Sequence, residues 1–316
     1  MVCVPTFMLP KKEGIHLDEM EERPVVIENL RHSYGEHVVY RGLSLNFEPG
    51  KIYGLLGKNG VGKTTLIKIL MGFLRPSGGS CTVFGDPAHD IRPETRARVG
   101  LLFERHLAYD FLSIEQIEKF YAHFYPHWNR EIYYEMVGRL KLPLTRPVAK
   151  MSEGQRSQVV LGLILAQDPE LLILDDYSMG LDAGYRRLFV DYIAEFFKDG
   201  KHTVILTSHV IQDMESFVDE IVFLERGGNS LRTSMGDFTK RFRLYRLPRP
   251  TAANCSPVAG DDIKNVEEHP VYWDIFSFSE EARVVAELRR QGFATEGIRR
   301  EEMNLEDAFI GYTGRY

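Results

Sequence analysis

The sequence has few cysteines and no long apolar run. Its 316 residues include three cysteines, Cys3, Cys81 and Cys255, scattered along the chain without a CxxC spacing. Such an odd, scattered set indicates neither a disulfide framework nor a zinc site, and it fits a reducing compartment. The longest apolar runs, 161–166 and 171–174, fall far short of the roughly 20 residues that cross a bilayer. Any role at a membrane therefore needs another chain.

An excess of positive charge is also missing. The net formal charge is −6, so the chain has no basic surplus with which to neutralise a nucleic-acid backbone. Hydrophobic residues make up 44% and charged residues 27%, which excludes the low-hydropathy composition of a disordered chain. Residues 1–23 carry many charges and no sustained apolar stretch, so we interpret them as an N-terminal extension and not as a signal peptide.

Hydrophobic patterning predicts alternating strands and helices. Short apolar runs separated by amphipathic segments predict parallel strands covered by helices, and a helical period fills residues 114–140. The expected strands are 25–30, 43–47, 51–56, 171–174, 203–206 and 221–224. Residues 227–262 are rich in Gly, Pro, Ser and Asn, which indicates a linker or a loose subdomain. A strand at 271–278 and a helix at 280–291 then predict a small C-terminal unit.

The strongest motif is a glycine-rich sequence between a predicted strand and a predicted helix. Residues 57–64 read GKNGVGKT and satisfy GxxxxGK[ST]. Glycines let the backbone wrap round phosphates with its N–H groups pointing inward, and the following helix N-terminus adds a favourable dipole. We expect Lys63 to supply charge to the β- and γ-phosphates and Thr64 to bind Mg²⁺.

A second motif supplies the other anchor for the metal. Residues 171–176 read LLILDD, an apolar strand that ends in Asp175 and Asp176. Asp175 is the expected partner of Mg²⁺, through water, whereas the alternative is that these carboxylates merely cap the next helix. Together with the glycine-rich loop, they predict a P-loop nucleotidase.

Five further segments resemble those of ABC ATPases and occur in that family's order. They are Tyr34 at the adenine-stacking position, Glu104 at the Q-loop glutamine, residues 151–155 (MSEGQ) at the signature LSGGQ, residues 178–182 (SMGLD) at the D-loop, and residues 207–209 (TSH) at the switch histidine, His209. The resemblance covers about residues 25–230. The chain is thereby identified as a member of the ABC ATPases.

That resemblance implies an α/β fold with a mixed core sheet, an antiparallel β subdomain and a helical subdomain. It divides the chain into the extension 1–23, the ATPase domain 24–230 with a helical part at about 105–165, and a linker with a small C-terminal α+β unit at 231–316. The residues that it places around ATP are Tyr34, Gly57, Lys58, Asn59, Gly60, Val61, Gly62, Lys63, Thr64, Thr65, Ser152, Gly154 and Gln155.

In an ABC dimer, ATP lies between the phosphate loop of one subunit and the signature of the other. Ser152 and Gly154 are therefore expected to contact the γ-phosphate across the interface, where the helix N-terminus presents donors. Hydrolysis then loosens the dimer and drives attached membrane subunits between their two states. A homodimer is favoured because closed two-fold dimers are the commonest assemblies. A distinct partner ATPase stays open, because some ABC heterodimers keep an Asp in one degenerate site.

Two departures from the family pattern bear on the chemistry. Asp176 stands where the family has the glutamate that polarises water, so its carboxylate reaches about 1.5 Å less far, and misplacement of that size can slow a reaction about 100-fold. Glu104 adds a negative charge beside Mg²⁺, as a metal ligand or a substitute base. Our hypothesis keeps Asp176 as the water-orienting base, with Glu104 on Mg²⁺ and His209 on the γ-phosphate. Glu153 replaces a signature glycine and lies near the bound phosphates unless it points outward.

The C-terminal sequence favours a transporter. Residues 303–310 (MNLEDAFI) resemble the LEDxF ending of ATPase subunits from drug, lipid and polysaccharide exporters whose membrane domains are separate chains. The resemblance implies permease partners, a location on the cytoplasmic face of the membrane, and export. The competing class is a soluble ABC ATPase that regulates or remodels a macromolecule. In either case Leu305 and Phe309 fit a short amphipathic helix packed on the core.

Two local clusters leave alternatives open. The aromatic residues that follow Glu104 fit core packing better than a docking groove for the membrane subunit, because several share one helical face. They are Tyr109, Phe111, Phe120, Tyr121, Phe124, Tyr125 and Trp128. The basic residues of 240–249 fit a solvated edge strand better than a surface for nucleic acid or acidic lipid. They are Lys240, Arg241, Arg243, Arg246 and Arg249.

Overall fold

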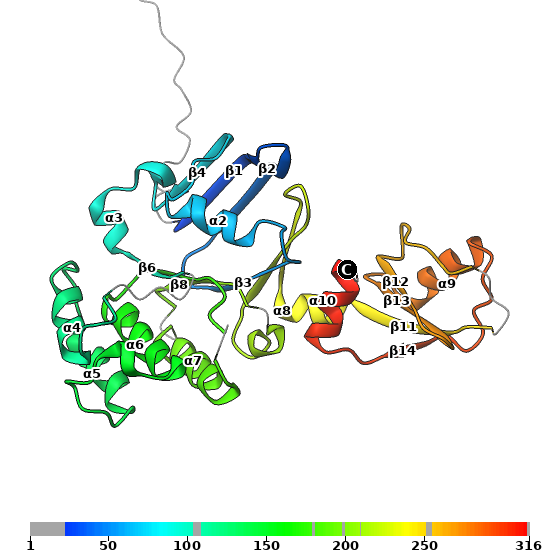
Figure 1. Ribbon diagram of the computed structural model, residues 1–316. Helices are drawn as coiled ribbons and strands as arrows, with labels where there is room; N and C mark the ends of the chain where they lie inside the picture. The colour runs from blue at the N-terminus through cyan, green and yellow to red at the C-terminus, as the bar shows by residue number, and fades with distance from the viewer. Residues whose placement is uncertain are drawn as a thin grey trace, which may run out of the picture.

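The computed structural model describes residues 23–103, 109–178, 181–197, 200–208, 210–250 and 255–314. A central sheet has an antiparallel sheet on one side and helices on the other, and a second body extends from its end (Figure 1). In the described part of the chain, no helix combines the length and the apolar character that crossing a membrane requires.

The central sheet has six strands in the order β10-β9-β3-β8-β7-β6. Five run parallel, and β10 pairs antiparallel with β9 at one edge. Strands β7 and β8 are buried at every residue, as expected for parallel strands covered on both faces. The bounds are β3 Ile52–Leu56, β6 Val99–Leu102, β7 Leu171–Leu174, β8 Thr203–Leu206, β9 Glu220–Leu224 and β10 Ser230–Ser234. The predicted parallel sheet is thus confirmed.

The antiparallel sheet covers the N-terminal side, with the order β2-β1-β4-β5. Its apolar face packs with helix α2 and the central strands into one core that includes Val25, Phe47, Leu66 and Val83. The bounds are β1 Val25–Tyr34, β2 His37–Phe47, β4 Gly78–Val83, β5 Asp86–Pro87 and α2 Lys63–Leu70, with η1 Ala88–Asp90 and α3 Pro93–Ala97 after them. This sheet brings β2 against the loop that precedes α2.

The opposite side of the central sheet is helical. Serine begins α4 and α6 with reciprocal capping boxes, Ser113 with Gln116 and Ser152 with Gln155, so the sequence fixes where both helices start. The bounds are α4 Ile114–Ala122, α5 Arg130–Gly138, η2 Val148–Lys150, α6 Glu153–Ala166, α7 Ala183–Phe196 and η3 Ile211–Met214. Helices α4, α5 and α6 share a core of their own, in agreement with the helical period seen in the sequence.

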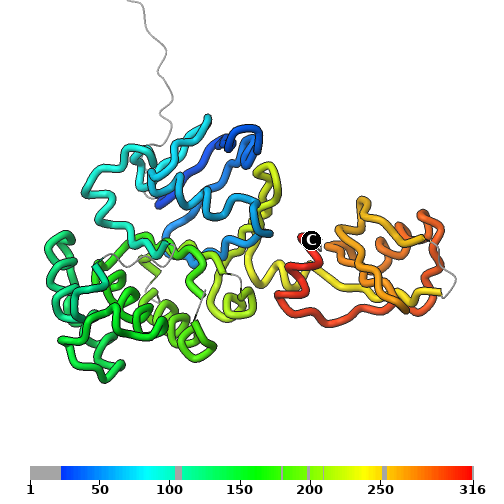
Figure 2. The backbone as a smooth tube through the Cα atoms, viewed as in Figure 1, coloured from blue at the N-terminus to red at the C-terminus, as the bar shows by residue number. Residues whose placement is uncertain are grey.

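The C-terminal body is a four-stranded antiparallel sheet, β12-β13-β11-β14, with helix α9 against it. Helices α8 and α10 lie between this sheet and the larger body, and the chain returns to that junction at its end (Figures 1 and 2). Aromatic rings fill the junction, with Phe223 of β9 at 4.5 Å from Tyr312 and 4.8 Å from Phe238 between ring centroids. The bounds are α8 Met235–Arg241, β11 Arg243–Pro248, β12 Asn265–Glu268, β13 Tyr272–Ser277, α9 Glu281–Arg290, β14 Arg299–Glu301 and α10 Leu305–Thr313.

Three sequence interpretations of these regions differ from the structure. Within residues 227–262, interpreted as a linker or a loose subdomain, β10, α8 and β11 occupy 230–248 and pack into the main core, which excludes a linker there. Strand β11 is not an edge strand, since β13 and β14 flank it. The arginines of β11 and Arg249, which follows it, are held in ion pairs: Arg243 with Glu280 at 2.6 Å, Arg246 with Asp274 at 2.8 Å and Arg249 with Glu268 at 2.5 Å.

The third correction concerns the aromatic cluster after residue 108. Most of these rings were expected in the core, but none of the seven is fully buried: Tyr121 and Trp128 pack against the core of α4, α5 and α6, and Phe120 and Tyr125 are partly buried. Phe111 and Phe124 are 70% and 64% exposed, and Tyr109 is 47% exposed. A helical period predicts which side chains share a face, but it does not say how much of that face a neighbour covers.

Candidate nucleotide-binding site

The glycine-rich loop leaves the end of β3 and turns sharply into α2. Gly57, Gly60 and Gly62 all have positive φ, at 155°, 79° and 114°. A Cβ on Gly62 would lie 2.5 Å from the Tyr40 hydroxyl, and one on Gly57 would lie 2.6 Å from the Leu224 carbonyl oxygen. Glycine is therefore required here both by backbone conformation and by the close approach of β2 and β9.

Lys63, the first residue of α2, turns its ammonium group back into the loop. Its Nζ donates to the carbonyl oxygens of Gly57 at 2.6 Å and Lys58 at 3.1 Å. Burial lowers the pKa of Lys63, and the nearby carboxylates of Asp175 and Asp176 oppose that shift. The loop, the cation and both carboxylates thus share one electrostatic environment.

Thr207 organises the two aspartates at the end of the parallel strands. Because Leu174 of β7 pairs with Leu206 of β8, the residues that follow these two strands lie side by side. The Thr207 hydroxyl donates to Asp175 Oδ1 at 2.8 Å and accepts from the Asp176 backbone N–H at 2.8 Å. Asp176 has a φ of 49°, a left-handed conformation that this hydrogen bond helps to hold.

A cavity of about 320 Å³ lies over these groups. It gathers most of the residues predicted from the sequence, together with His37, Val39 and Thr207, whose contribution the sequence reasoning missed. The lining is Tyr34, His37, Val39, Asn59, Gly60, Gly62, Lys63, Thr64, Thr65, Asp175, Asp176, Thr207 and Ser208. Tyr34 is 49% exposed at its rim and touches His32 edge-on, so its ring is accessible from the cavity side.

The signature residues lie elsewhere in the chain's own fold. Ser152, Gly154 and Gln155 begin α6 and do not line this cavity. The Ser152 hydroxyl accepts from the Gln155 N–H at 3.4 Å, while the Gln155 side chain accepts from the Ser152 N–H at 3.1 Å. A Cβ on Gly154 would lie 2.3 Å from the Tyr185 ring, so packing against α7 explains this glycine. Glu153 is exposed at the first position of α6.

The remaining predicted residues divide into two groups. Lys58 and Val61 belong to the loop, but they line a different cavity on its far side. Glu104 and His209 lie outside the described residues.

The donors present fit magnesium better than a metal held by protein alone. Within the described ranges, no three His, Cys, Asp or Glu side chains come together to hold a metal ion. Mg²⁺ in phosphate sites takes one or two protein oxygens and completes its shell with phosphate and water. Thr64 and Asp175, which both line this cavity, offer oxygens of this kind.

Together the strand–loop–helix cradle and the paired aspartates define a P-loop nucleotide-binding protein. A family model described as "ABC transporter" matches residues 40–178. The "Nod factor export ATP-binding protein I" of Cupriavidus pinatubonensis is 32% identical over 332 residues, covering 99% of this chain and 95% of the relative. Its counterpart in Cupriavidus metallidurans is 28% identical over 313 residues, covering 92% and 97%.

A solved structure titled "Structure of ATP binding subunit of ABC transporter" supports the fold, with a TM-score of 0.60 and 22% identity over 68% of this chain and 92% of that one. The chain therefore belongs to the ABC transporter family, as one of its ATP-binding subunits. Membership implies ATPase activity, and the predicted ABC ATPase fold is confirmed.

Proposed function

We propose that this chain binds and hydrolyses ATP with Mg²⁺ and powers a membrane exporter through the closing and opening of an ATPase dimer. The observation that carries the proposal is the meeting of Lys63, Thr64, Asp175 and Asp176 around one cavity with an aromatic ring at its rim. Loop N–H groups and Lys63 bind the phosphates, Tyr34 stacks on adenine, and Thr64 and Asp175 hold Mg²⁺, which offsets phosphate charge when bound.

Asp176 orients the attacking water in this mechanism. The hydrogen bond from its backbone N–H to the Thr207 hydroxyl fixes the position of the Asp176 backbone, and the short side chain then limits how far its carboxylate extends toward the water. ATP turnover by this chain is accordingly slower than in family members with the usual glutamate, by about 100-fold if the carboxylate lies about 1 Å from the position that the glutamate would give it. From the sequence alone, Glu104 ligates Mg²⁺ and His209 contacts the γ-phosphate.

The second half of the site comes from another ATPase subunit. Ser152, Gly154 and Gln155 stand at the N-terminus of a 14-residue helix, where the positive end of the helix dipole favours an anion. The capping box holds that end in shape before ATP arrives. We assign the other subunit to a second copy of this chain, since a two-fold dimer places each signature over the opposite phosphate loop.

Membrane subunits dock, in this proposal, beside the exposed aromatic cluster. Tyr121 and Tyr125 line a groove of about 230 Å³ with Phe73, Leu101 and Phe103, between the central sheet and the helical part. An apolar groove with exposed rings at its margin is typical of a protein interface. The named export role of both Cupriavidus relatives supports export, and docking of this kind puts the chain on the cytoplasmic face of the membrane.

Two substitutions test the proposal in purified protein. Lys63→Ala should abolish both equilibrium ATP binding and ATP-dependent dimerisation, because it removes the cation in the loop. Lys119→Ala, which removes an exposed lysine of α4, is the matched control. ATP binding and dimerisation that survive in Lys63→Ala would end the proposal.

Asp176→Asn should keep ATP binding and lose steady-state hydrolysis, with Asp191→Asn on the surface of α7 as its control. The Glu104→Gln variant is measured alongside. Undiminished turnover in Asp176→Asn removes that residue from the role of base, and turnover lost only in Glu104→Gln transfers the role to Glu104.

A further inference from the structure

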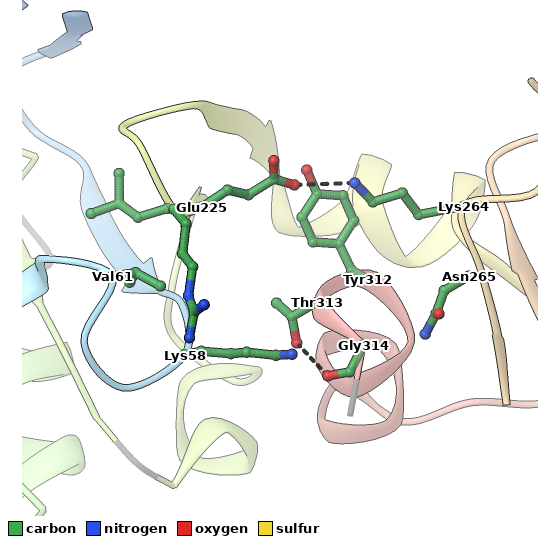
Figure 3. Close-up of a pocket in the computed structure, with 10 residues that line it drawn as sticks. Lys58, Val61, Glu225, Lys264, Asn265, Tyr312, Thr313 and Gly314 are labelled. Atoms are coloured by element: carbon green, nitrogen blue, oxygen red, sulfur yellow. Dashed lines mark hydrogen bonds and ion pairs between the residues drawn. The ribbon is translucent and has the colours of Figure 1, made fainter. Parts of the chain in front are cut away.

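A second cavity borders the phosphate loop and shares none of its lining residues with the ATP site. Its volume is about 560 Å³, within the range of small-molecule sites. Three separate segments line it: the outer side of the phosphate loop, the end of β9, and the C-terminal body (Figure 3). The residues are Lys58, Val61, Leu224, Glu225, Arg226, Lys264, Asn265, Tyr312, Thr313 and Gly314.

The charged groups of this lining are mostly basic. Three are cationic, Lys58, Arg226 and Lys264, and one is anionic, Glu225. Glu225 is already neutralised, because its Oε1 lies 3.1 Å from Lys264 Nζ, which in turn sits 4.3 Å from the centre of the Tyr312 ring. Arg226 has no ion pair or hydrogen bond with any residue that the structure describes. The lining therefore carries more donors than acceptors.

Lys58 and Asn265 approach the same point at the end of α10. A Cβ built on Gly314 would lie 3.8 Å from Lys58 Nζ, 3.8 Å from Asn265 Nδ2 and 3.9 Å from Asn265 Oδ1. Asn265 Nδ2 is shielded from solvent and finds no hydrogen-bond partner in the described part of the chain. Leaving a buried amide donor unpaired is unfavourable, so an acceptor supplied from outside is favoured there.

We propose that this cavity binds a small molecule with an anionic group, phosphate or carboxylate, and an apolar body. Arg226, Lys58 and Asn265 bind the anionic group, since all three line this cavity and the two cations offer charge-assisted donors, which suit oxyanions. Val61, Leu224 and the Tyr312 ring, all nearly buried, contact the apolar part. The ligand bridges the phosphate loop and the C-terminal body, so its binding changes how firmly that loop is held.

Calorimetric titration of the full chain tests this site apart from the ATP site. The Lys63→Ala background removes phosphate binding in the loop, and Mg²⁺ is left out. Pyrophosphate and citrate serve as probes, so that phosphate and carboxylate chemistry are distinguished. We expect saturable binding of one probe per chain, weakened about tenfold or more by Arg226→Met and by Asn265→Leu, because each removes a donor to the anion.

Arg139→Met, which removes an exposed arginine of α5, is the matched control and should bind as the background does. No saturable binding of either probe would overturn the proposal. Equal binding in Arg226→Met, Asn265→Leu and Arg139→Met would do the same. Because the test is run with the ATP site disabled, failure here leaves the proposed ATPase function untouched.

Discussion

Replacing Tyr40 with phenylalanine tests whether one buried hydroxyl keeps the phosphate loop in its binding shape. Tyr40 lies on β2, is 1% exposed, and donates to the Gly62 carbonyl oxygen at 2.5 Å. Burial raises the pKa of Tyr40 well above its ordinary value, so the hydroxyl remains protonated and able to donate at neutral pH. Gly62 is the N-cap of α2, directly before Lys63, so the bond acts on the residue that turns the loop into the helix.

The size of the effect of Tyr40→Phe depends on which hydrogen bonds the Gly62 carbonyl oxygen still accepts. Gly62 O also accepts from the Leu66 N–H at 2.8 Å, so Tyr40→Phe leaves no orphaned acceptor, and the retained ring leaves no large void. The loss is then that of one net hydrogen bond, about 0.5–1.5 kcal/mol. If the loop loses that much of its preorganisation, ATP affinity falls by about 2- to 13-fold.

Tyr133→Phe is the matched control for this prediction. Tyr133 is also fully buried, and it donates at 2.7 Å to the carbonyl of Ile114, which is likewise at the start of a helix. Both variants should lower the free energy of unfolding by about 0.5–1.5 kcal/mol in chemical denaturation. Only Tyr40→Phe should raise the KM for ATP and the equilibrium dissociation constant, with kcat little changed. Equal ATP affinity in the two variants refutes a positioning role and makes Tyr40 a packing residue.

Two further predictions concern residues next to the site. Thr207→Val removes the donor to Asp175 and the acceptor of the Asp176 N–H, and loss of such an outer partner should raise the Mg²⁺ concentration for half-maximal ATP hydrolysis by about 10- to 100-fold; an unchanged magnesium titration contradicts it. Gly154→Ala should lower the free energy of unfolding by about 1–3 kcal/mol, because its Cβ meets the Tyr185 ring at 2.3 Å. Gly138→Ala, whose Cβ meets nothing within 4 Å, should be neutral or stabilising, and equal losses in the two variants would exclude the clash.

Local sequence was sufficient for the elements that build the ATP site. Strands β7 and β8 have the predicted bounds, because a short apolar run between polar residues is what a doubly covered parallel strand requires. The glycine-rich loop was equally predictable, since its backbone conformation allows few residues other than glycine at these positions. The glycine-rich loop follows β3 and the aspartates follow β7, two parallel strands separated by β8, so both motifs lie at the same edge of the sheet.

Non-local contacts explain what the sequence did not predict. Residues 227–262 were interpreted as a linker or a loose subdomain from composition, but Gly227 and Gly228 form the turn of an antiparallel pair, and aromatic rings from distant segments pack against α8 and the start of β11. The role of the Tyr40 hydroxyl could not be predicted from the sequence, because a tyrosine in an apolar strand usually only packs in the core. The sequence also did not indicate side-chain direction: the motif does not predict that Lys58 lines a cavity other than the ATP site.

The two sides of the phosphate loop are joined through the end of β9. Arg41, next to Tyr40, donates from its backbone N–H to the Gly227 carbonyl oxygen at 2.9 Å, and Glu225, two residues earlier, pairs with Lys264 of the C-terminal body. These contacts connect the C-terminal body to β2, and the hydrogen bond of the Tyr40 hydroxyl connects β2 to the phosphate loop at Gly62. A route of contacts alone is only a spatial connection, and coupling requires that both ends bias one equilibrium. Combining Tyr40→Phe with Lys264→Met distinguishes the two, because coupled residues give a non-additive change in ATP affinity and independent ones give a simple sum.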